Sequence, residues 1–481
     1  MVTDLVVVLP GILGSTLRQG DRMVWAPSAG SVVRAVTTFG ASLTDLRLPD
    51  GVGDEHPGDG VEPVDLMPDR HAIPGLWTPV KGYDRLLKRL RRIGLHDTGP
   101  HDTGPHDTGP HDTGREPGNL LPIPYDWRLS NRHNGQRLAA IVEPALARWR
   151  ARGGPYADAR LVFVCHSMGG LVARWYVQRC GGSDITRATI LLGTPYRGAL
   201  KALAQLANGF PELLGGLGER LNEFAHSLPS LHQLLPEYAC IDRGGTLATL
   251  DESAVAGIDT AMVGDAMRFH AQLKEAEQAR PDGIDATHLI VGVRQATPTT
   301  AQIGTGGVSA LDTYLGEDLA GDATVPVTGA TPAGTPLDSS RLHRVADKHG
   351  NLQRNDAALD QVESVVTSRP IIVRGADEYS PRVLTPELVR AGDPVPVEVH
   401  LPERLGIRIT VTDEAGSVIE SRSPVLDRGG TVVTSFAGLA PGAYTIDVVG
   451  VGVASPVAPV SSDLVVWPAQ GPFQRPTYPR G

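Results

Sequence analysis

A serine between a predicted strand and a predicted helix is the strongest chemical signal in the sequence. Ser167 lies in the hexapeptide CHSMGG, after the apolar run 161–164 and before the apolar segment 171–177. A serine on such a sharp turn is exposed at the top of a parallel sheet, and the turn needs small residues two positions before and after it. Cys165 and Gly169 meet this requirement. The pattern predicts a nucleophile elbow, and therefore a serine hydrolase or acyltransferase. The alternative is a polar residue in an ordinary glycine-rich turn.

A serine nucleophile needs a histidine as general base and a carboxylate that orients this histidine. In α/β-hydrolases the acid and then the histidine follow the serine along the chain. We expect Asp322 to be the acid, because it lies in the turn GDATVPV just before a predicted strand at 324–327. The alternative for Asp322 is a turn aspartate that binds its own backbone. We expect His349 to be the base, since it lies in a loop before the predicted helix 357–366.

Two neighbouring residues remain as alternatives. His343 also follows Asp322, but it falls within a predicted strand at 341–345. Asp347 competes as the orienting acid, although two residues is a short span for a contact between its carboxylate and the His349 imidazole.

The negative charge that develops on the substrate oxygen needs two backbone N–H donors, each worth roughly 3–4 kcal/mol of the barrier. One donor is expected to be Met168, the residue after the nucleophile. The other should come from the turn after an early strand, and the segment 5–15 has that form. We therefore expect Ile12 to be the second donor. The alternative for the Pro10-Gly11 pair is an ordinary strand-terminating turn.

Motifs along residues 5–366 resemble, in the same order, those of the lecithin:cholesterol acyltransferase family. They are VLPGILGS at 8–15, YDWR at 125–128, HSMGG at 166–170, GTPYRG at 193–198, GDATVP at 321–326, and His349. The resemblance implies an α/β-hydrolase fold and a serine that attacks an acyl ester of a glycerophospholipid. The acyl group would pass to water or to an alcohol. The resemblance also implies that Ser167, Asp322 and His349 form the triad and that Ile12 and Met168 are the oxyanion donors.

The resemblance carries two further expectations and one departure. Asp126 and Arg128 of the YDWR motif are expected to form a partly buried ion pair near the upper edge of the sheet, with substrate contact as the alternative. Secreted family members carry a disulfide after the first strand, near a tryptophan that helps engage lipid. Trp25 is the possible counterpart of that tryptophan, but no cysteine lies near it. With three cysteines, at positions 165, 180 and 240, we expect no disulfide framework.

Composition narrows the class of protein. The chain has 481 residues and a net charge of −10, which argues against nucleic acid as a partner and against adsorption to anionic membranes through a basic surface. Any lipid contact must then be mainly apolar. The chemistry implies no metal and no organic cofactor. Because no signal peptide and no run of about 20 apolar residues is recognisable, we expect a cytoplasmic protein.

The chain divides into an expected α/β-hydrolase catalytic domain at 1–368, an immunoglobulin-like β-sandwich at 369–467 and a disordered tail at 468–481. The sandwich is predicted from period-2 strands separated by turns. Within the first domain, the HDTGP repeats at 96–114 are expected to form a solvated loop insert. These repeats do not predict a metal site, because glycine and proline recur too often for a regular scaffold. Residues of about 199–260 are expected to cap the site.

An apolar stripe within this cap segment has two interpretations. It is either buried core or the face of a lid that opens onto lipid, with glycines as hinges. Its members are Leu200, Leu203, Leu206, Phe210, Leu213, Leu214, Leu217 and Leu221.

The sequence therefore predicts a serine phospholipase or acyltransferase whose sandwich has a docking or stabilising role and offers a possible protein-partner surface. One alternative is a lipase or carboxylesterase for smaller esters. The other is a catalytically idle binding protein that has kept the hydrolase fold.

Overall fold

The computed structural model describes residues 2–26, 46–69, 81–98, 118–251, 253, 255–280, 286–305, 307–336, 339, 341–370, 379–452 and 455–469. Most of the expected insert at 96–114 and of the expected tail at 468–481 lies outside these residues. In the described part of the chain, no helix combines the length and the apolar character that crossing a bilayer requires.

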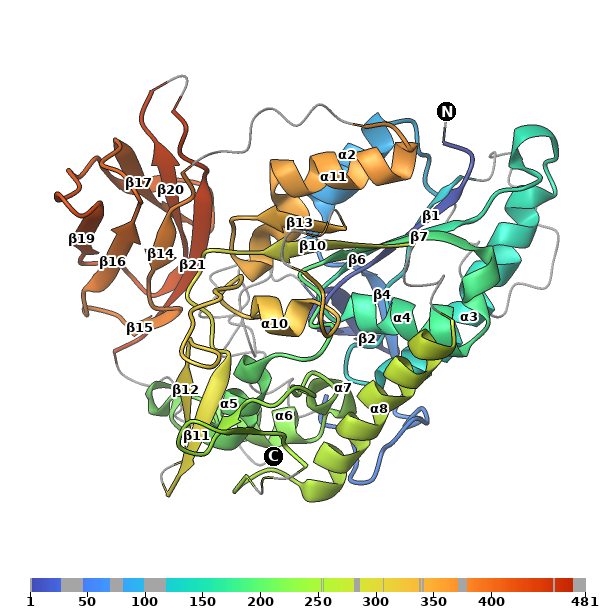
Figure 1. Cartoon of the computed structure of the whole chain (residues 1–481), viewed down its shortest axis with the longest axis horizontal. Coiled ribbons are helices and arrows are strands. Elements are labelled where there is room, and N and C mark those ends of the chain that lie inside the picture. The colour runs from blue at the N-terminus through green and yellow to red at the C-terminus, as the bar shows by residue number, and fades with distance from the viewer. Residues whose placement is uncertain are drawn as a thin grey trace, which may run out of the picture.

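A parallel sheet forms the centre of the larger part of the molecule. Its strands are β1 (Leu5–Leu9), β5 (Leu120–Pro122), β6 (Leu161–His166), β7 (Thr186–Leu192), β10 (Thr287–Gly292) and β13 (Leu342–Val345). They lie in the order β13-β10-β7-β6-β1-β5, and every neighbouring pair is parallel (Figure 1). The carboxyl ends of these strands therefore lie along one edge of the sheet.

Helices cover both faces of this sheet. They are α2 (Asp84–Arg92), α3 (Asn131–Arg150), α4 (Gly169–Arg179), α8 (Thr260–Ala279) and α11 (Asp356–Thr367). Figure 1 shows α2 and α11 on one face and α3, α4 and α8 on the other. Because successive strand residues point to opposite faces, Val6 and Val162 pack with α2 and α11, whereas Val7 and Phe163 pack with α3 and α4. This is the α/β-hydrolase fold that the sequence predicts.

Further elements surround the carboxyl edge of the sheet. A small sheet follows β1 and contains β2 (Ser15–Gln19), β3 (Arg22–Trp25) and β4 (Val61–Leu66). Another contains β8 (Ile241–Asp242), β9 (Leu247–Ala248), β11 (Thr300–Gly304) and β12 (Gly307–Leu311). Short helices α5 (Leu200–Asn208), α6 (Gly216–His226), α7 (Pro229–His232) and α10 (Val327–Ala330) complete this side.

The apolar stripe of the cap segment is mostly buried in this structure. Leu200 and Leu203 of α5 are fully buried, and Leu217 of α6 is 1% exposed. Phe210 and Leu213 are partly buried against the same core. The arrangement is the one that the core interpretation expects.

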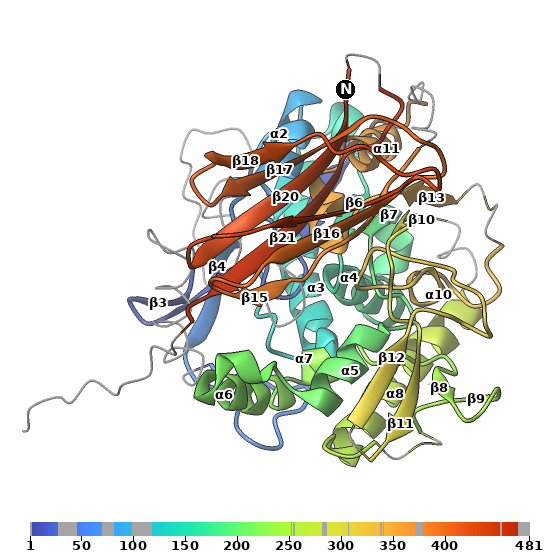
Figure 2. The ribbon, with the colours of Figure 1, turned by 90° about the vertical axis from the view of Figure 1, so that its left-hand side faces the viewer.

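Two antiparallel-rich sheets at the C-terminal end form a sandwich. Its strands are β14 (Arg382–Leu384), β15 (Leu388–Arg390), β16 (Val395–His400), β17 (Ile407–Asp413), β18 (Val418–Arg422), β19 (Thr431–Phe436), β20 (Gly442–Gly450) and β21 (Val460–Trp467). One sheet has the order β14-β16-β19 and the other β15-β21-β20-β17-β18. Figure 2 looks onto this part of the molecule, which carries its own buried core.

The sandwich is packed against the hydrolase fold by both apolar and polar contacts. Trp467 of β21 is 2% exposed and belongs to the hydrolase core. Asn351 Nδ2 donates to the Ser461 carbonyl at 2.7 Å, and Lys81 Nζ lies 3.4 Å from Asp463 Oδ1. Gln295 Nε2 donates to the Pro381 backbone carbonyl at 3.0 Å. The domain boundaries expected at 368 and 467 themselves stay predictions.

Two local expectations are wrong. Asp126 and Arg128 are fully rather than partly buried, because the Arg128 guanidinium is enclosed by Asp126, Asp59 and the Leu46 carbonyl. Trp25, the possible counterpart of the family tryptophan, is 2% exposed in this structure, and its indole N–H donates to the Leu13 carbonyl at 3.1 Å.

The second wrong expectation concerns the segment after Asp322. The predicted strand at 324–327 is absent from this described segment, where bends lead into helix α10. Asp322 Oδ1 accepts the N–H groups of Thr324 and Val325, and these bonds turn the chain away from an extended conformation.

The buried Arg128 gives a prediction about stability. Substitution Arg128→Met should lower the free energy of unfolding by about 3–5 kcal/mol, because it leaves the buried Asp126 carboxylate without its cation. The matched control Arg18→Met breaks an ion pair in which the two side chains are 45% and 68% exposed, so its effect should stay below about 1 kcal/mol. Urea unfolding of the two variants would measure this difference, and equal effects would contradict it.

Candidate active site

Ser167 occupies a strained turn directly after β6 and before α4. Its φ angle is +52°, a left-handed conformation that a residue with a side chain seldom adopts. A Cβ on Gly169 would lie 2.3 Å from the Pro10 carbonyl oxygen, and one on Gly170 would lie 2.1 Å from Thr194 Oγ1. The turn therefore closes only because these positions carry no side chain, as the elbow pattern requires.

A chain of hydrogen bonds joins the three residues that the sequence singled out. His349 Nε2 lies 2.8 Å from Ser167 Oγ, and His349 Nδ1 lies 2.7 Å from Asp322 Oδ2. A carboxylate oxygen only accepts, so we assign the proton to Nδ1. Nε2 then carries the lone pair and accepts the Ser167 hydroxyl. The geometry is that of a hydroxyl, a base and an orienting acid.

The Asp322 side chain is fixed from several directions. Oδ1 accepts the N–H groups of Thr324 at 3.0 Å and of Val325 at 2.6 Å, which leaves Oδ2 for His349. The His349 N–H also donates to the Asp322 carbonyl at 2.8 Å. A Cβ on Gly292, at the end of β10, would lie 2.3 Å from the Asp322 Cβ. The acid thus lies against the carboxyl end of β10.

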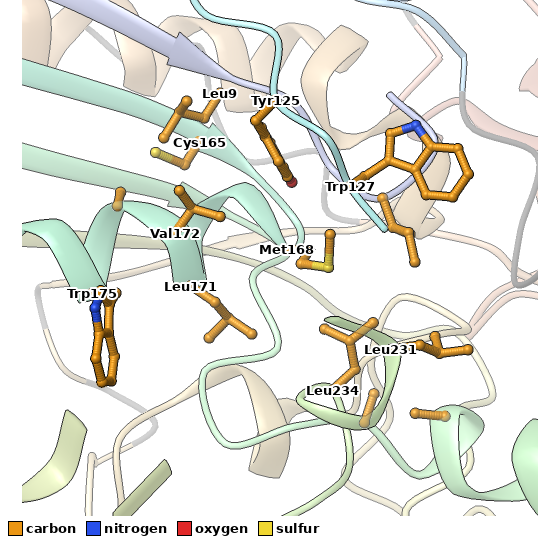
Figure 3. Close-up of a cluster of buried hydrophobic side chains, with 14 of the residues drawn as sticks. Leu9, Tyr125, Trp127, Cys165, Met168, Leu171, Val172, Trp175, Leu231 and Leu234 are labelled. Atoms are coloured by element: carbon orange, nitrogen blue, oxygen red, sulfur yellow. The ribbon is translucent and has the colours of Figure 1, made fainter. Parts of the chain in front are cut away.

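The two expected oxyanion donors flank the serine. A Cβ on Gly11 would lie 2.9 Å from the Ser167 Cβ, so the turn with Ile12 lies directly beside the elbow. Within the described residues, neither the Ile12 N–H nor the Met168 N–H has a hydrogen-bond acceptor. Because neither group is paired, both N–H groups are available to a ligand. The Met168 side chain is fully buried in the hydrophobic cluster that also contains Trp127 and Leu234 (Figure 3).

The two alternative residues take part in other contacts. His343 lies in β13, where its Nε2 accepts from Gln361 Nε2 at 2.8 Å. Asp347 accepts from Asn355 Nδ2 at 3.1 Å, and burial raises its pKa to about 6. The structure therefore brings His349 and Asp322 to Ser167, and directs His343 and Asp347 elsewhere.

Two residues for which the sequence predicted no role lie behind the site. Tyr83 and His166 are 0% and 1% exposed, and the Tyr83 hydroxyl lies 3.0 Å from His166 Nδ1. Burial, and secondly the neighbouring His349, lower the pKa of His166 to about 3. A side chain 83 positions away along the chain leaves no local signal, so sequence patterns do not reveal this pair.

The cavity in front of Ser167 is small and apolar. It has a volume of about 30 Å³ and is lined by residues that include Ile12, Leu13, Ala202 and Leu234. This is room for one or two water molecules, against roughly 300–1,000 Å³ for a typical ligand pocket. A larger hollow of about 1340 Å³ lies between the hydrolase fold and the sandwich, and its lining lacks the three bonded residues. The three bonded residues therefore lie at the small cavity and not at this larger hollow.

Comparison with known families matches the elbow region. A sequence model described as lecithin:cholesterol acyltransferase matches residues 111–254. Over this segment, which is less than half of the chain, the sequence is similar to that family. The segment includes the YDWR motif and Ser167, whereas Asp322 and His349 lie beyond it. No curated protein sequence matches the chain.

Solved structures give distant likenesses. A Bacillus licheniformis lipase in its propeptide form is 13% identical, with a TM-score of 0.32, and the match covers 72% of this chain and 86% of that chain. CopC from Methylosinus trichosporium OB3b is 14% identical with a TM-score of 0.16, covering 19% of this chain and 91% of that chain. The lecithin:cholesterol acyltransferase family and the α/β-hydrolase fold support an enzyme that hydrolyses or transfers acyl esters.

Gly193, directly after β7, provides a test of the site geometry. It has a φ angle of +59°, and a Cβ there would lie 2.6 Å from Leu352 Cδ1 and 3.1 Å from both Asp322 Oδ2 and His349 Nδ1. Gly193→Ala should displace the acid and base and lower turnover of p-nitrophenyl butyrate by about 10–100-fold, since small misplacements of reacting groups have such effects.

Gly181→Ala is the matched control. Gly181 has a φ angle of +85° and open space around the added Cβ, so the substitution brings the backbone strain without the collision. Both variants should lose roughly 1–2 kcal/mol of stability, but only Gly193→Ala should lose activity. Equal activity of the two variants would contradict the geometry described here.

Proposed function

We propose that this chain is a serine phospholipase or O-acyltransferase that cleaves acyl esters of glycerophospholipids. The observation that carries the proposal is the unbroken line of hydrogen bonds from Ser167 Oγ through the His349 ring to Asp322 Oδ2. Ser167, His349 and Asp322 then act as nucleophile, general base and orienting acid. The family match supports the acyl-ester chemistry.

In the first half of the reaction Ser167 Oγ attacks the ester carbonyl carbon while His349 Nε2 takes the hydroxyl proton. The carbonyl oxygen becomes an anion, which the N–H groups of Ile12 and Met168 stabilise. The bond to the glycerol oxygen then breaks, and His349 returns the proton to that oxygen. A lysophospholipid leaves and the acyl group stays on Ser167.

In the second half water or an alcohol attacks the acyl-enzyme. His349 Nε2 takes a proton from this nucleophile, and a second oxyanion forms at the same two N–H groups. The bond to Ser167 Oγ breaks, and His349 gives the proton back to Ser167. The product is a fatty acid from water or a new ester from an alcohol.

The apolar cavity lining favours an acyl chain, but its volume of about 30 Å³ is too small for one. We therefore propose that the roof opens during substrate binding. Ala199 and Ala202 at the start of α5 and Leu234 after α7 form part of this roof. In an opened state these segments would offer the apolar contact with lipid that the lid interpretation of the sequence expects.

The small cavity also favours a second candidate function. A carboxylesterase for short acyl esters needs less room and less movement of the roof. A catalytically idle binding protein is disfavoured, because the three reactive groups lie at hydrogen-bonding distance. A protein partner of the sandwich and a cytoplasmic location stay predictions of the sequence.

Products formed on phosphatidylcholine liposomes that contain a long-chain alcohol test the proposal. Wild type should form lysophospholipid together with fatty acid or alcohol ester, measured by mass spectrometry. Ser167→Ala should lower product formation by at least about 10³-fold, because the nucleophile is lost. The ratio of ester to free acid separates transferase from hydrolase activity.

Ser421→Ala, at an exposed position in β18, is the control and should behave as wild type. Cleavage of short esters without any lysophospholipid would replace the proposal by the carboxylesterase function. Equal product formation by wild type and Ser167→Ala would contradict both.

A further inference from the structure

Three hydrogen bonds connect the loop after β1 with the backbone of His349. The Gly11 N–H donates to the Tyr83 hydroxyl oxygen at 2.7 Å. The same hydroxyl lies 3.0 Å from His166 Nδ1, and His166 Nε2 lies 3.1 Å from the His349 carbonyl oxygen. All the side chains involved are buried. This chain of hydrogen bonds thus connects the two sides of the elbow through His166, the residue that precedes Ser167.

The direction of each bond follows from its partners. The His349 carbonyl can only accept, so His166 Nε2 carries the proton. In a neutral imidazole the other nitrogen, Nδ1, then accepts, and the Tyr83 hydroxyl is its donor. The Tyr83 oxygen still has a lone pair for the Gly11 N–H. Because His166 has a pKa of about 3, it stays neutral and this pattern persists at ordinary pH.

The two ends of this line are the parts of the site that must be fixed relative to one another. Gly11 precedes Ile12, whose N–H is the proposed oxyanion donor. His349 is held at its own N–H by the Asp322 carbonyl and at its carbonyl by His166. The His166 and His349 rings lie with their centroids 5.1 Å apart. Loss of the Tyr83 hydroxyl would remove the bond to the Gly11 N–H and the bond to His166 Nδ1, and with them the connection between the two loops.

We propose that Tyr83 and His166 are positioning residues. They fix the position of the Gly11–Ile12 turn relative to the His349 loop, on the two sides of Ser167. The inference rests on the proposed function, since it assigns these residues to the geometry of that reaction. Neither side chain touches the substrate. Their contribution is to keep the oxyanion donor and the base at the distances that the tetrahedral intermediate needs.

Tyr83→Phe tests the proposal, because it removes one oxygen and leaves the ring. We expect kcat for p-nitrophenyl butyrate to fall by about 10–100-fold with KM within twofold of wild type. The rate of Ser167 labelling by a fluorophosphonate should fall by a similar factor. Turnover is expressed per labelled serine, so that loss of folded protein does not count as loss of kcat.

Tyr238→Phe is the matched control. Tyr238 is 1% exposed, and its hydroxyl donates to the Thr299 carbonyl at 3.2 Å, away from the site. Tyr83→Phe loses two buried hydrogen bonds and Tyr238→Phe loses one, so both should lower the melting temperature, Tyr83→Phe by the larger amount. Tyr238→Phe should keep the wild-type kcat. If Tyr83→Phe also keeps a kcat within twofold of this control, the proposal is overturned.

Two variants of His166 test its two hydrogen bonds separately: the bond from Tyr83 and the bond to the His349 carbonyl. An asparagine places its amide near Nδ1 and can accept from Tyr83, whereas a glutamine places its amide near Nε2 and can donate to the His349 carbonyl. Each keeps half of the connection, so both His166→Asn and His166→Gln should lower kcat at least about tenfold. Full kcat in either variant would overturn the requirement for both ends. A wild type that neither hydrolyses the ester nor reacts with the fluorophosphonate would instead overturn the proposed function, and the positioning role with it.

Discussion

The left-handed backbone at Ser167 is the constraint around which the rest of the site is arranged. It lifts the side chain out of β6 and brings the following turn against the loop from β1. At such distances there is no room for side chains, and the neighbouring positions are glycines: Gly11, Gly169 and Gly170. The strain at one residue is maintained because buried strands and helices on both faces of the sheet hold the flanking chain.

The parallel sheet then determines which segments can meet at this turn. The loops after β1, β6 and β7 and the segment after β13 all leave the same edge. Asp322 returns to this edge after a long excursion and lies against the end of β10. Residues as far apart as Gly11 and His349 therefore lie within one hydrogen-bonded group, although no two of these segments are adjacent in sequence.

The sequence allowed the fold class to be predicted, and it singled out the three residues that the structure joins by hydrogen bonds, because these depend on local patterns and chain order. Ser167 was found from its flanking apolar segments, and Asp322 and His349 from their order after it. Other features depend on long-range contacts that local patterns do not contain. The full burial of Arg128, the inward orientation of Trp25 and the Tyr83–His166 bond are of this kind. The prediction of a strand after Asp322 was wrong because the Asp322 carboxylate accepts hydrogen bonds from the N–H groups of that segment.

The packing of β21, the last strand of the sandwich, has a consequence for how the molecule unfolds. Trp467 of β21 packs in the same hydrophobic core as Leu5 and Val7 of β1, and Asn351, two residues after His349, donates a hydrogen bond to the β21 backbone. Melting of the sandwich would therefore open a cavity in the hydrolase fold and free the segment after His349. The two parts should unfold as a single cooperative unit, so the C-terminal strands contribute to the lifetime of the native state of the whole chain.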